Sequence, residues 1–134
     1  MKWEDDHQCF ACGKNNTDGL QLDFKLVGNK LITEYTFPKK FQGYAEIVHG
    51  GMLSLVLDEV MVNLPWKRDG VPAVSAELNI RLKKPVKIGQ KVIFTSEVEK
   101  EIKGIIYVKG EARLENGEIA ATGTAKCVKV KIDA

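Results

Sequence analysis

The sequence predicts an α+β domain in which an antiparallel sheet packs on one principal helix. Residues 51–64 carry apolar side chains on nearly every face of a helix, which is typical of a helix that is buried. Stretches in which apolar and polar residues alternate flank this helix on both sides, and such alternation indicates strands with one buried face.

Two strands are expected before the helix, over residues 19–27 and 30–37. Gly28-Asn29 between them suits a tight hairpin turn. Residues 38–48 have the composition of a loop.

The helix is expected to run from Gly51 to Leu64 and to stop at Pro65. Proline lacks a backbone donor and clashes with the preceding turn, so it commonly ends a helix.

Longer strands are expected after the helix. In the first of them, Leu78, Ile80 and Leu82 share one face. Asn116-Gly117 is a strong hairpin signal before the last strand. The expected ranges are 72–83, 91–101, 104–114 and 118–132.

Length and composition predict one domain over residues 1–134, with residues 1–18 as an N-terminal extension packed on it. A net charge of +2 gives no sign of a nucleic-acid binder. No apolar run approaches the roughly 20 residues needed to span a bilayer, and the N-terminus lacks the character of a signal peptide. We therefore expect a cytoplasmic protein without nucleic-acid or membrane partners.

The most informative motif is His49-Gly50-Gly51 at the start of the helix, with Asp58 nine residues after the histidine. Two glycines allow a ligand to approach the backbone closely, and the first amides of a helix have no acceptor within it. Such amides can polarise a carbonyl group. A carboxylate within an apolar helix is costly unless it has a use.

These residues resemble the hotdog-fold acyl-CoA thioesterases, in particular the phenylacetate-pathway-like branch with an H-G-G signature before the central helix. In that branch a catalytic Asp lies nine residues after the signature His, as Asp58 does here. The similarity extends downstream through residues 73–82, Pro85 and Gly89, and upstream through the segment from Cys9 to Leu20.

The resemblance implies a hotdog fold, with the sheet wrapped round one long helix, and a homodimer or homotetramer with sites at the dimer interface. It also implies that an acyl-CoA is hydrolysed to the free acid and CoA. The Gly51 amide would polarise the thioester carbonyl, and Asp58 would act as general base or as nucleophile. Ser75 would position the attacking water, and His49 would orient the loop or contact the carbonyl region.

Further candidates for substrate binding are Gly50, Gln42, Glu59, Lys83 and Lys84. Relatives carry Asn or Gln six residues before the His, but Gly43 occupies that position here and Gln42 is its neighbour. Because Asp58 and Glu59 point about 100° apart on a helix, only one of them can face the thioester, and the spacing favours Asp58. The lysines are either solvent-facing strand residues or ligands of the CoA phosphates.

Other function classes remain open. One is a non-catalytic hotdog module that binds acyl-CoA or fatty acyl groups, although Asp58 argues against it. Another is a hydratase or dehydratase of the same fold.

The cysteines leave a further alternative, a zinc site made by His7, Cys9, Cys12 and Cys127. Reduced cysteines that pack the N-terminal segment are the preferred interpretation. No metal and no cofactor are therefore expected, and hydrolysis is expected to survive a strong chelator.

Overall fold

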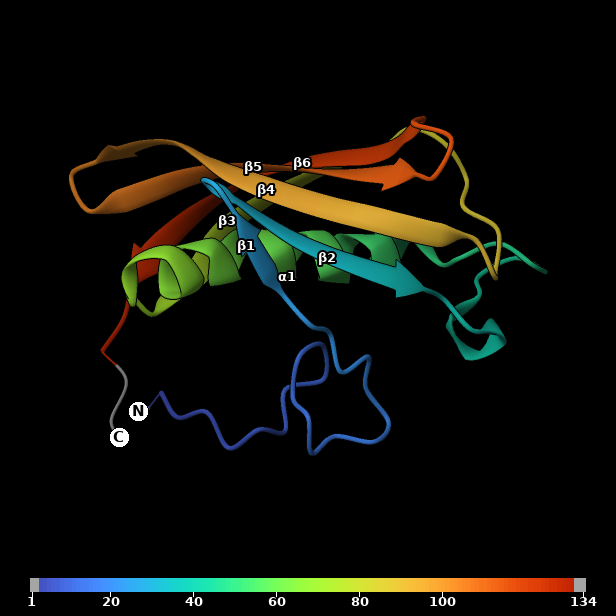
Figure 1. The fold of residues 1–134 in the computed structure, drawn as a ribbon, viewed down its shortest axis with the longest axis horizontal. Coiled ribbons are helices and arrows are strands. Elements are labelled where there is room, and N and C mark those ends of the chain that lie inside the picture. Colours follow the sequence, from blue (N-terminus) through green and yellow to red (C-terminus); the bar gives the residue numbers. More distant parts are fainter. Residues whose placement is uncertain (1–2, 132–134) are drawn as a thin grey trace.

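The computed structural model describes residues 3–131, and in this range one six-stranded antiparallel sheet packs on one long helix (Figure 1). The order of strands across the sheet is β1-β2-β4-β5-β6-β3, so that β1 and β3 form its two edges. This arrangement confirms the α+β prediction. The strands are β1 (Lys25–Val27), β2 (Lys30–Thr36), β3 (Ala73–Leu82), β4 (Lys91–Ile102), β5 (Ile105–Leu114) and β6 (Ile119–Lys129).

Both hairpins that the sequence predicts are present. Gly28 lies in the turn between β1 and β2 with a φ of 62°, and Gly117 lies between β5 and β6 with a φ of 90°. Glycine adopts these left-handed conformations without a steric penalty. The strand predicted over residues 118–132 ends at Lys129, and residue 132 lies outside the described range.

The first strand is much shorter than residues 19–27, because the chain before β1 pairs with the N-terminal segment instead. The amides of Leu20 and Leu22 donate to the carbonyls of Phe10 and Ala11. Gln21 between them has a φ of 53°, which interrupts an extended strand. In the loop before the helix, residues Lys39–Phe41 form a short 3-10 helix, η1.

Helix α1 spans Gly50–Asp69, so the prediction that it stops at Pro65 was wrong. Pro65 is buried inside the helix, where it costs the hydrogen bond that its missing N–H would make. The helix ends instead at Gly70, which adopts the left-handed conformation and donates its N–H to the carbonyl of Trp66. A glycine of this kind is a common helix terminator.

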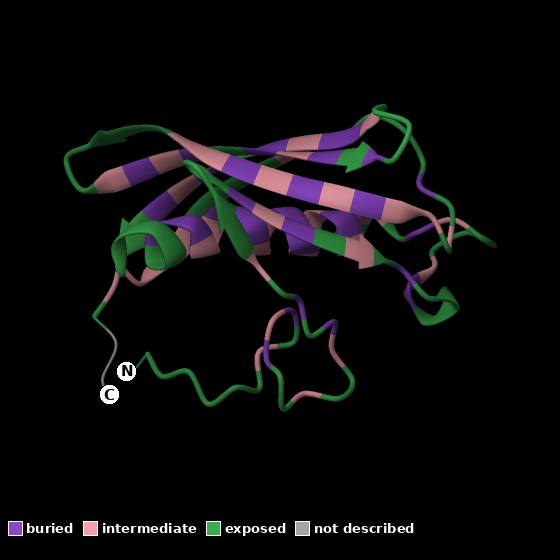
Figure 2. Ribbon diagram, viewed as in Figure 1, coloured by how far each residue is buried: buried purple, intermediate pink, exposed green. Residues whose placement is uncertain are grey.

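The core lies between α1 and the sheet, as the buried residues on facing surfaces show (Figure 2). Gly110 and Gly123 face each other across β5 and β6 and leave space for Met61 of α1. A Cβ atom at either glycine would lie 3.0 or 3.1 Å from the Met61 side chain. The buried side chains of the helix are Leu53, Val56, Leu57, Val60, Met61, Leu64 and Pro65.

The N-terminal segment lies on the side of α1 that faces away from the sheet (Figure 1). Ala11 of this segment, and Leu20 and Leu22 of the chain that pairs with it, are buried in the core cluster. The helix is therefore covered from two sides, which explains why it is apolar nearly all round. Within residues 3–131, no helix is long and apolar enough to cross a membrane.

Two of the apolar residues that share one face of the edge strand β3 are exposed, although the alternation indicates a buried face. Leu78 is 38% exposed and Leu82 is 54% exposed. The strand pairs with β6 along one side only. A ten-residue unpaired edge with apolar side chains is a surface that proteins usually cover.

Candidate active site

The N-terminus of α1 begins at the His-Gly-Gly motif, and His49 is its capping residue. The Nδ1 atom of His49 accepts a hydrogen bond of 2.9 Å from the Gly51 N–H. The Gly51 amide, which the sequence analysis assigned to the substrate carbonyl, is thus engaged by the histidine. A carbonyl that binds this amide must first displace the imidazole.

The Gly50 amide differs from its neighbour, because no acceptor for it occurs among the hydrogen bonds of residues 3–131. Its Cα lies close to β3, so that a Cβ at this position would be 2.6 Å from Cδ1 of Leu82. An unsatisfied N–H at a helix N-terminus carries partial positive charge and attracts a carbonyl oxygen. The Gly50 amide is therefore available as a hydrogen-bond donor to the substrate carbonyl, whereas the sequence led us to expect the Gly51 amide in this role.

A groove of about 570 Å³ opens at this end of the helix. His49 and Gly50 line it together with apolar residues, among them Leu53 and Leu82, and Lys83 and Lys84 lie at its wall. Lys84 donates a hydrogen bond to the Glu118 carboxylate, whereas Lys83 makes no ion pair with any described residue. The groove thus combines an apolar wall, a free amide and a positive charge.

Asp58 lies two turns further along α1, where it is half-buried and accepts a hydrogen bond from the Ser75 hydroxyl. Ser75 is on β3 at an irregularity in the pairing, because the register with β6 shifts between Ser75 and Glu77. Such a bulge re-aims a side chain. The structure therefore brings together the two residues that the resemblance connected.

Cys127 of β6 is a further neighbour of Asp58, which the sequence did not indicate. It is fully buried and pairs with Ser75 across the two strands. Burial, with a smaller contribution from the Asp58 charge, raises the pKa of the Cys127 thiol to about 11. The thiol is therefore a neutral neighbour of the carboxylate, and only the register of β3 against β6 reveals it.

The two groups of candidate residues do not meet within one chain. Eight residues separate Gly50 from Asp58, and a rise of about 1.5 Å per residue puts them about 12 Å apart along the helix axis. A thioester carbonyl that touches the Gly50 amide is therefore out of reach of the Asp58 carboxylate of the same chain.

Gln42 and Gly43 have local roles in the loop before the helix. Oε1 of Gln42 accepts a hydrogen bond of 3.1 Å from the Glu46 amide, which stabilises the turn between them. Gly43 packs beside His49, since a Cβ there would be 3.4 Å from the His49 Cα. Gly43 also lines the groove, but it offers no side chain to hold water.

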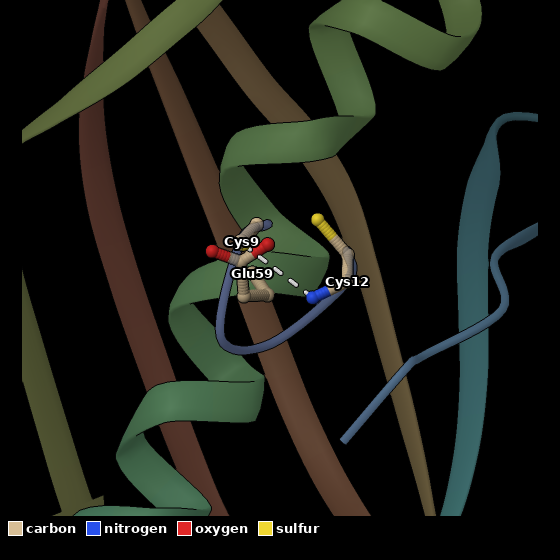
Figure 3. A group of neighbouring side chains, drawn as sticks. All are labelled: Cys9, Cys12 and Glu59. Atoms are coloured by element: carbon tan, nitrogen blue, oxygen red, sulfur yellow. Dashed lines mark hydrogen bonds between the residues drawn. The ribbon is translucent and has the colours of Figure 1, made fainter. Parts of the chain in front are cut away.

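Glu59 points away from the groove, toward the N-terminal segment. Its carboxylate lies with the thiols of Cys9 and Cys12 (Figure 3) and accepts a hydrogen bond of 2.9 Å from Asn63. The structure does not assemble the alternative zinc set, because Cys127 lies beside Asp58 and the side chain of His7 is exposed beside Asp5.

Comparisons with known proteins agree with this fold. The family model of the thioesterase superfamily matches residues 45–121. Acyl-coenzyme A thioesterase 13 of Mus musculus is 26% identical over 96 residues, which cover 70% of this chain and 69% of the relative.

Two solved structures have the same fold. A phenylacetic acid degradation-related protein of Ralstonia eutropha JMP134 is 27% identical with a TM-score of 0.73, and the match covers 83% of this chain and 86% of that one. A Streptococcus mutans UA159 protein bound to acetyl-CoA is 17% identical with a TM-score of 0.75, covering 84% and 91%.

The fold prediction is thereby confirmed as the hotdog fold, with α1 as its central helix. The family match spans more than half of the chain and includes the His-Gly-Gly motif, Asp58 and Ser75. The chain belongs to the thioesterase superfamily.

Proposed function

We propose that this protein hydrolyses acyl-CoA thioesters to the free acid and CoA, at a site that two chains form together. The observation that carries the proposal is the half-buried Asp58 carboxylate, which the Ser75 hydroxyl holds within the central helix of a thioesterase-family fold. A carboxylate fixed in this way is suited to act as a base or as a nucleophile.

The chemistry begins with the thioester carbonyl oxygen at the N-terminus of α1. The Gly50 amide donates to this oxygen, and Gly51 adds a second donor if the carbonyl displaces His49. Negative charge builds up on the oxygen during attack, so these donors stabilise the transition state more than the substrate.

Asp58 then promotes the attack, by one of two routes. As a general base it takes a proton from water, the resulting hydroxide adds to the carbonyl carbon, and the carbon–sulfur bond breaks. The CoA thiolate leaves and recovers the proton. As a nucleophile, Asp58 adds to the carbonyl carbon, the carbon–sulfur bond breaks and CoA leaves as its thiolate, and water then hydrolyses the resulting mixed anhydride. Ser75 orients the carboxylate in both routes.

The separation of about 12 Å between Gly50 and Asp58 supports a site shared by two chains. Gly50 lies beside Leu82, at one end of β3, while Asp58 bonds to Ser75 near the other end. Antiparallel pairing of β3 with its copy, about a two-fold axis between Leu78 and Asn79, brings Ser75 of one chain opposite Leu82 of the other. This pairing would also cover the exposed apolar edge.

The lysines of the groove are suited to the CoA phosphates. Lys83 is exposed and has no ion pair within the described residues, so its ammonium is available as a point charge for a phosphate. Lys84 is held by Glu118, which makes it the weaker candidate. The three free cysteines suit a reducing compartment, and we therefore infer a cytoplasmic location.

The direct test is steady-state hydrolysis of a panel of aromatic, short-chain and medium-chain acyl-CoAs by the wild type and by Asp58→Asn. We expect the wild type to turn over at least one class, and Asp58→Asn to lose about 10² to 10⁴ in kcat while it remains folded and still binds substrate. Binding without hydrolysis by the wild type would indicate a non-catalytic acyl-binding module. Loss of hydrolysis in Glu59→Gln but not in Asp58→Asn would refute the assignment on the helix.

A further inference from the structure

Three side chains outside the groove converge on one point between the N-terminal segment and α1. The thiols of Cys9 and Cys12 come from the segment and the carboxylate of Glu59 comes from the helix (Figure 3). The two sulfur atoms and a carboxylate oxygen all lie within 4.8 Å of one another. All three residues are partly buried.

The loop that carries the two cysteines is shaped around the sulfur of Cys9. The backbone N–H of Cys12 points at the Cys9 Sγ with a donor-to-sulfur distance of 3.4 Å. Gly13 follows directly and donates its N–H to the Cys9 carbonyl at 2.8 Å. A Cβ at Gly13 would be 2.4 Å from the Cys9 nitrogen, so this tight turn requires glycine. A backbone donor directed at a sulfur stabilises a thiolate more than a thiol.

The cluster lacks a positive partner. Each of its three groups becomes an anion when it loses a proton, and Asp58 adds a further carboxylate one residue away. No Lys or Arg within residues 3–131 forms an ion pair with Glu59. A bound cation would supply the missing charge.

We propose that Cys9, Cys12 and Glu59 bind one zinc ion, with a water molecule as the fourth ligand. Two thiolates favour a soft divalent metal such as zinc over calcium or magnesium. Zinc to sulfur bonds of about 2.3 Å and zinc to oxygen bonds of about 2.0 Å require ligand atoms roughly 3.5 to 4 Å apart in a tetrahedron. The three ligand atoms lie within 4.8 Å of one another, which is close to this spacing.

The zinc ion is structural in this proposal. It fastens the N-terminal segment to α1 beside Asp58, where Ala11 of the same segment is buried. Glu59 and Asp58 point about 100° apart on the helix, and the metal lies on the Glu59 side, toward the N-terminal segment. From the sequence, no metal was expected. The proposed ligands also differ from the alternative zinc site, which included His7 and Cys127 and lacked Glu59.

The first test is elemental analysis of the full-length protein purified under reducing conditions. We expect about one zinc per chain, because metal-binding sites of this kind fill when their thiolates form. Cys9→Ser, Cys12→Ser and Glu59→Gln should each lower the zinc content at least tenfold. His7→Asn and Cys127→Ser are the matched controls, and both should keep the metal. Equal zinc in all five variants, or no zinc in the wild type purified under reducing conditions, would overturn the proposal.

A second test needs no substitution and so avoids variants that fail to fold. The metal-free wild type is titrated with Co²⁺, which should produce sulfur-to-cobalt charge-transfer absorption with an end point of one cobalt per chain, and zinc should abolish this absorption. Chelation should also lower the unfolding temperature, and zinc should restore it. No charge-transfer band, together with an unfolding temperature unchanged by chelation, would refute the site whether or not the protein hydrolyses acyl-CoA.

Discussion

Gly50→Pro removes a single backbone N–H at a position where helices commonly accept proline. Gly50 is the first residue of α1 after the capping residue His49, and proline is favoured at the first helical position. His49 has φ −60° and ψ 131°, an extended conformation that suits the residue before a proline. Since the Gly50 N–H has no acceptor among the described residues, the folded state loses no hydrogen bond.

The expected magnitude follows from the proposed role of this amide in the transition state. Removing one donor from an oxyanion site typically lowers kcat by about 10² to 10³. A substituent at Gly50 also meets Leu82, where a Cβ would lie 2.6 Å from Cδ1, but this is the end of a flexible and exposed side chain. Gly50→Ala adds the same Cβ and keeps the N–H, so the ratio of the kcat values of the two variants measures the contribution of the N–H donor alone.

The assay is release of CoA thiol at saturating acyl-CoA, with circular dichroism to verify folding. We expect kcat of Gly50→Pro to be about 10² to 10³ below that of Gly50→Ala. Equal kcat values for the two variants would refute the role of the Gly50 amide. If Gly51→Pro alone abolished hydrolysis, the carbonyl donor would be Gly51, as the sequence analysis had it.

The remaining predictions concern the Asp58 environment, the groove, the buried thiol and chelation. Ser75→Ala should lower kcat with little change in KM, because Asp58 loses its orienting donor; an unchanged kcat would contradict this. Lys83→Gln should raise the KM for acyl-CoA, and KM of this variant should change less than that of the wild type between low and physiological ionic strength. The denaturant concentration at the unfolding midpoint should fall as pH rises from 9.0 toward about 11, because the pKa of Cys127 is higher in the folded state than in the unfolded state. Cys127→Ala should make this fall shallower. Prolonged chelation should leave hydrolysis measurable at temperatures below the lowered unfolding temperature, since the Asp58 carboxylate and not a metal ion promotes the attack.

The sequence predicts most of the secondary structure, because periodicity and turn residues are local signals. The alternation from β3 to β6 and the turns at Gly28 and Gly117 are examples. The end of the helix is different. Pro65 normally stops a helix, but its neighbour Leu64 is fully buried and packing extends α1 to Asp69. Tertiary burial outweighed a local preference there.

The candidate site is predictable only in part. The spacing from His49 to Asp58 and the resemblance to known thioesterases indicate the residues, and the structure adds the hydrogen bond between Asp58 and Ser75. No local signal shows that His49 occupies the Gly51 amide, because histidine is an uncommon helix cap. The proximity of Glu59 to Cys9 also escapes sequence reasoning, since fifty residues separate them and only the packed N-terminal segment joins them.

Subunit complementation between Asp58→Asn and Gly50→Pro chains would show whether two chains share one site. Each variant alone should be nearly inactive. After denaturation and refolding as an equal mixture, half of the dimers are hybrids, and each hybrid contains one site with an intact Asp58 and an intact Gly50. We therefore predict recovery of about one quarter of the wild-type activity. If the mixture were as inactive as its components while native mass spectrometry resolved hybrid dimers, the site would not be shared between chains.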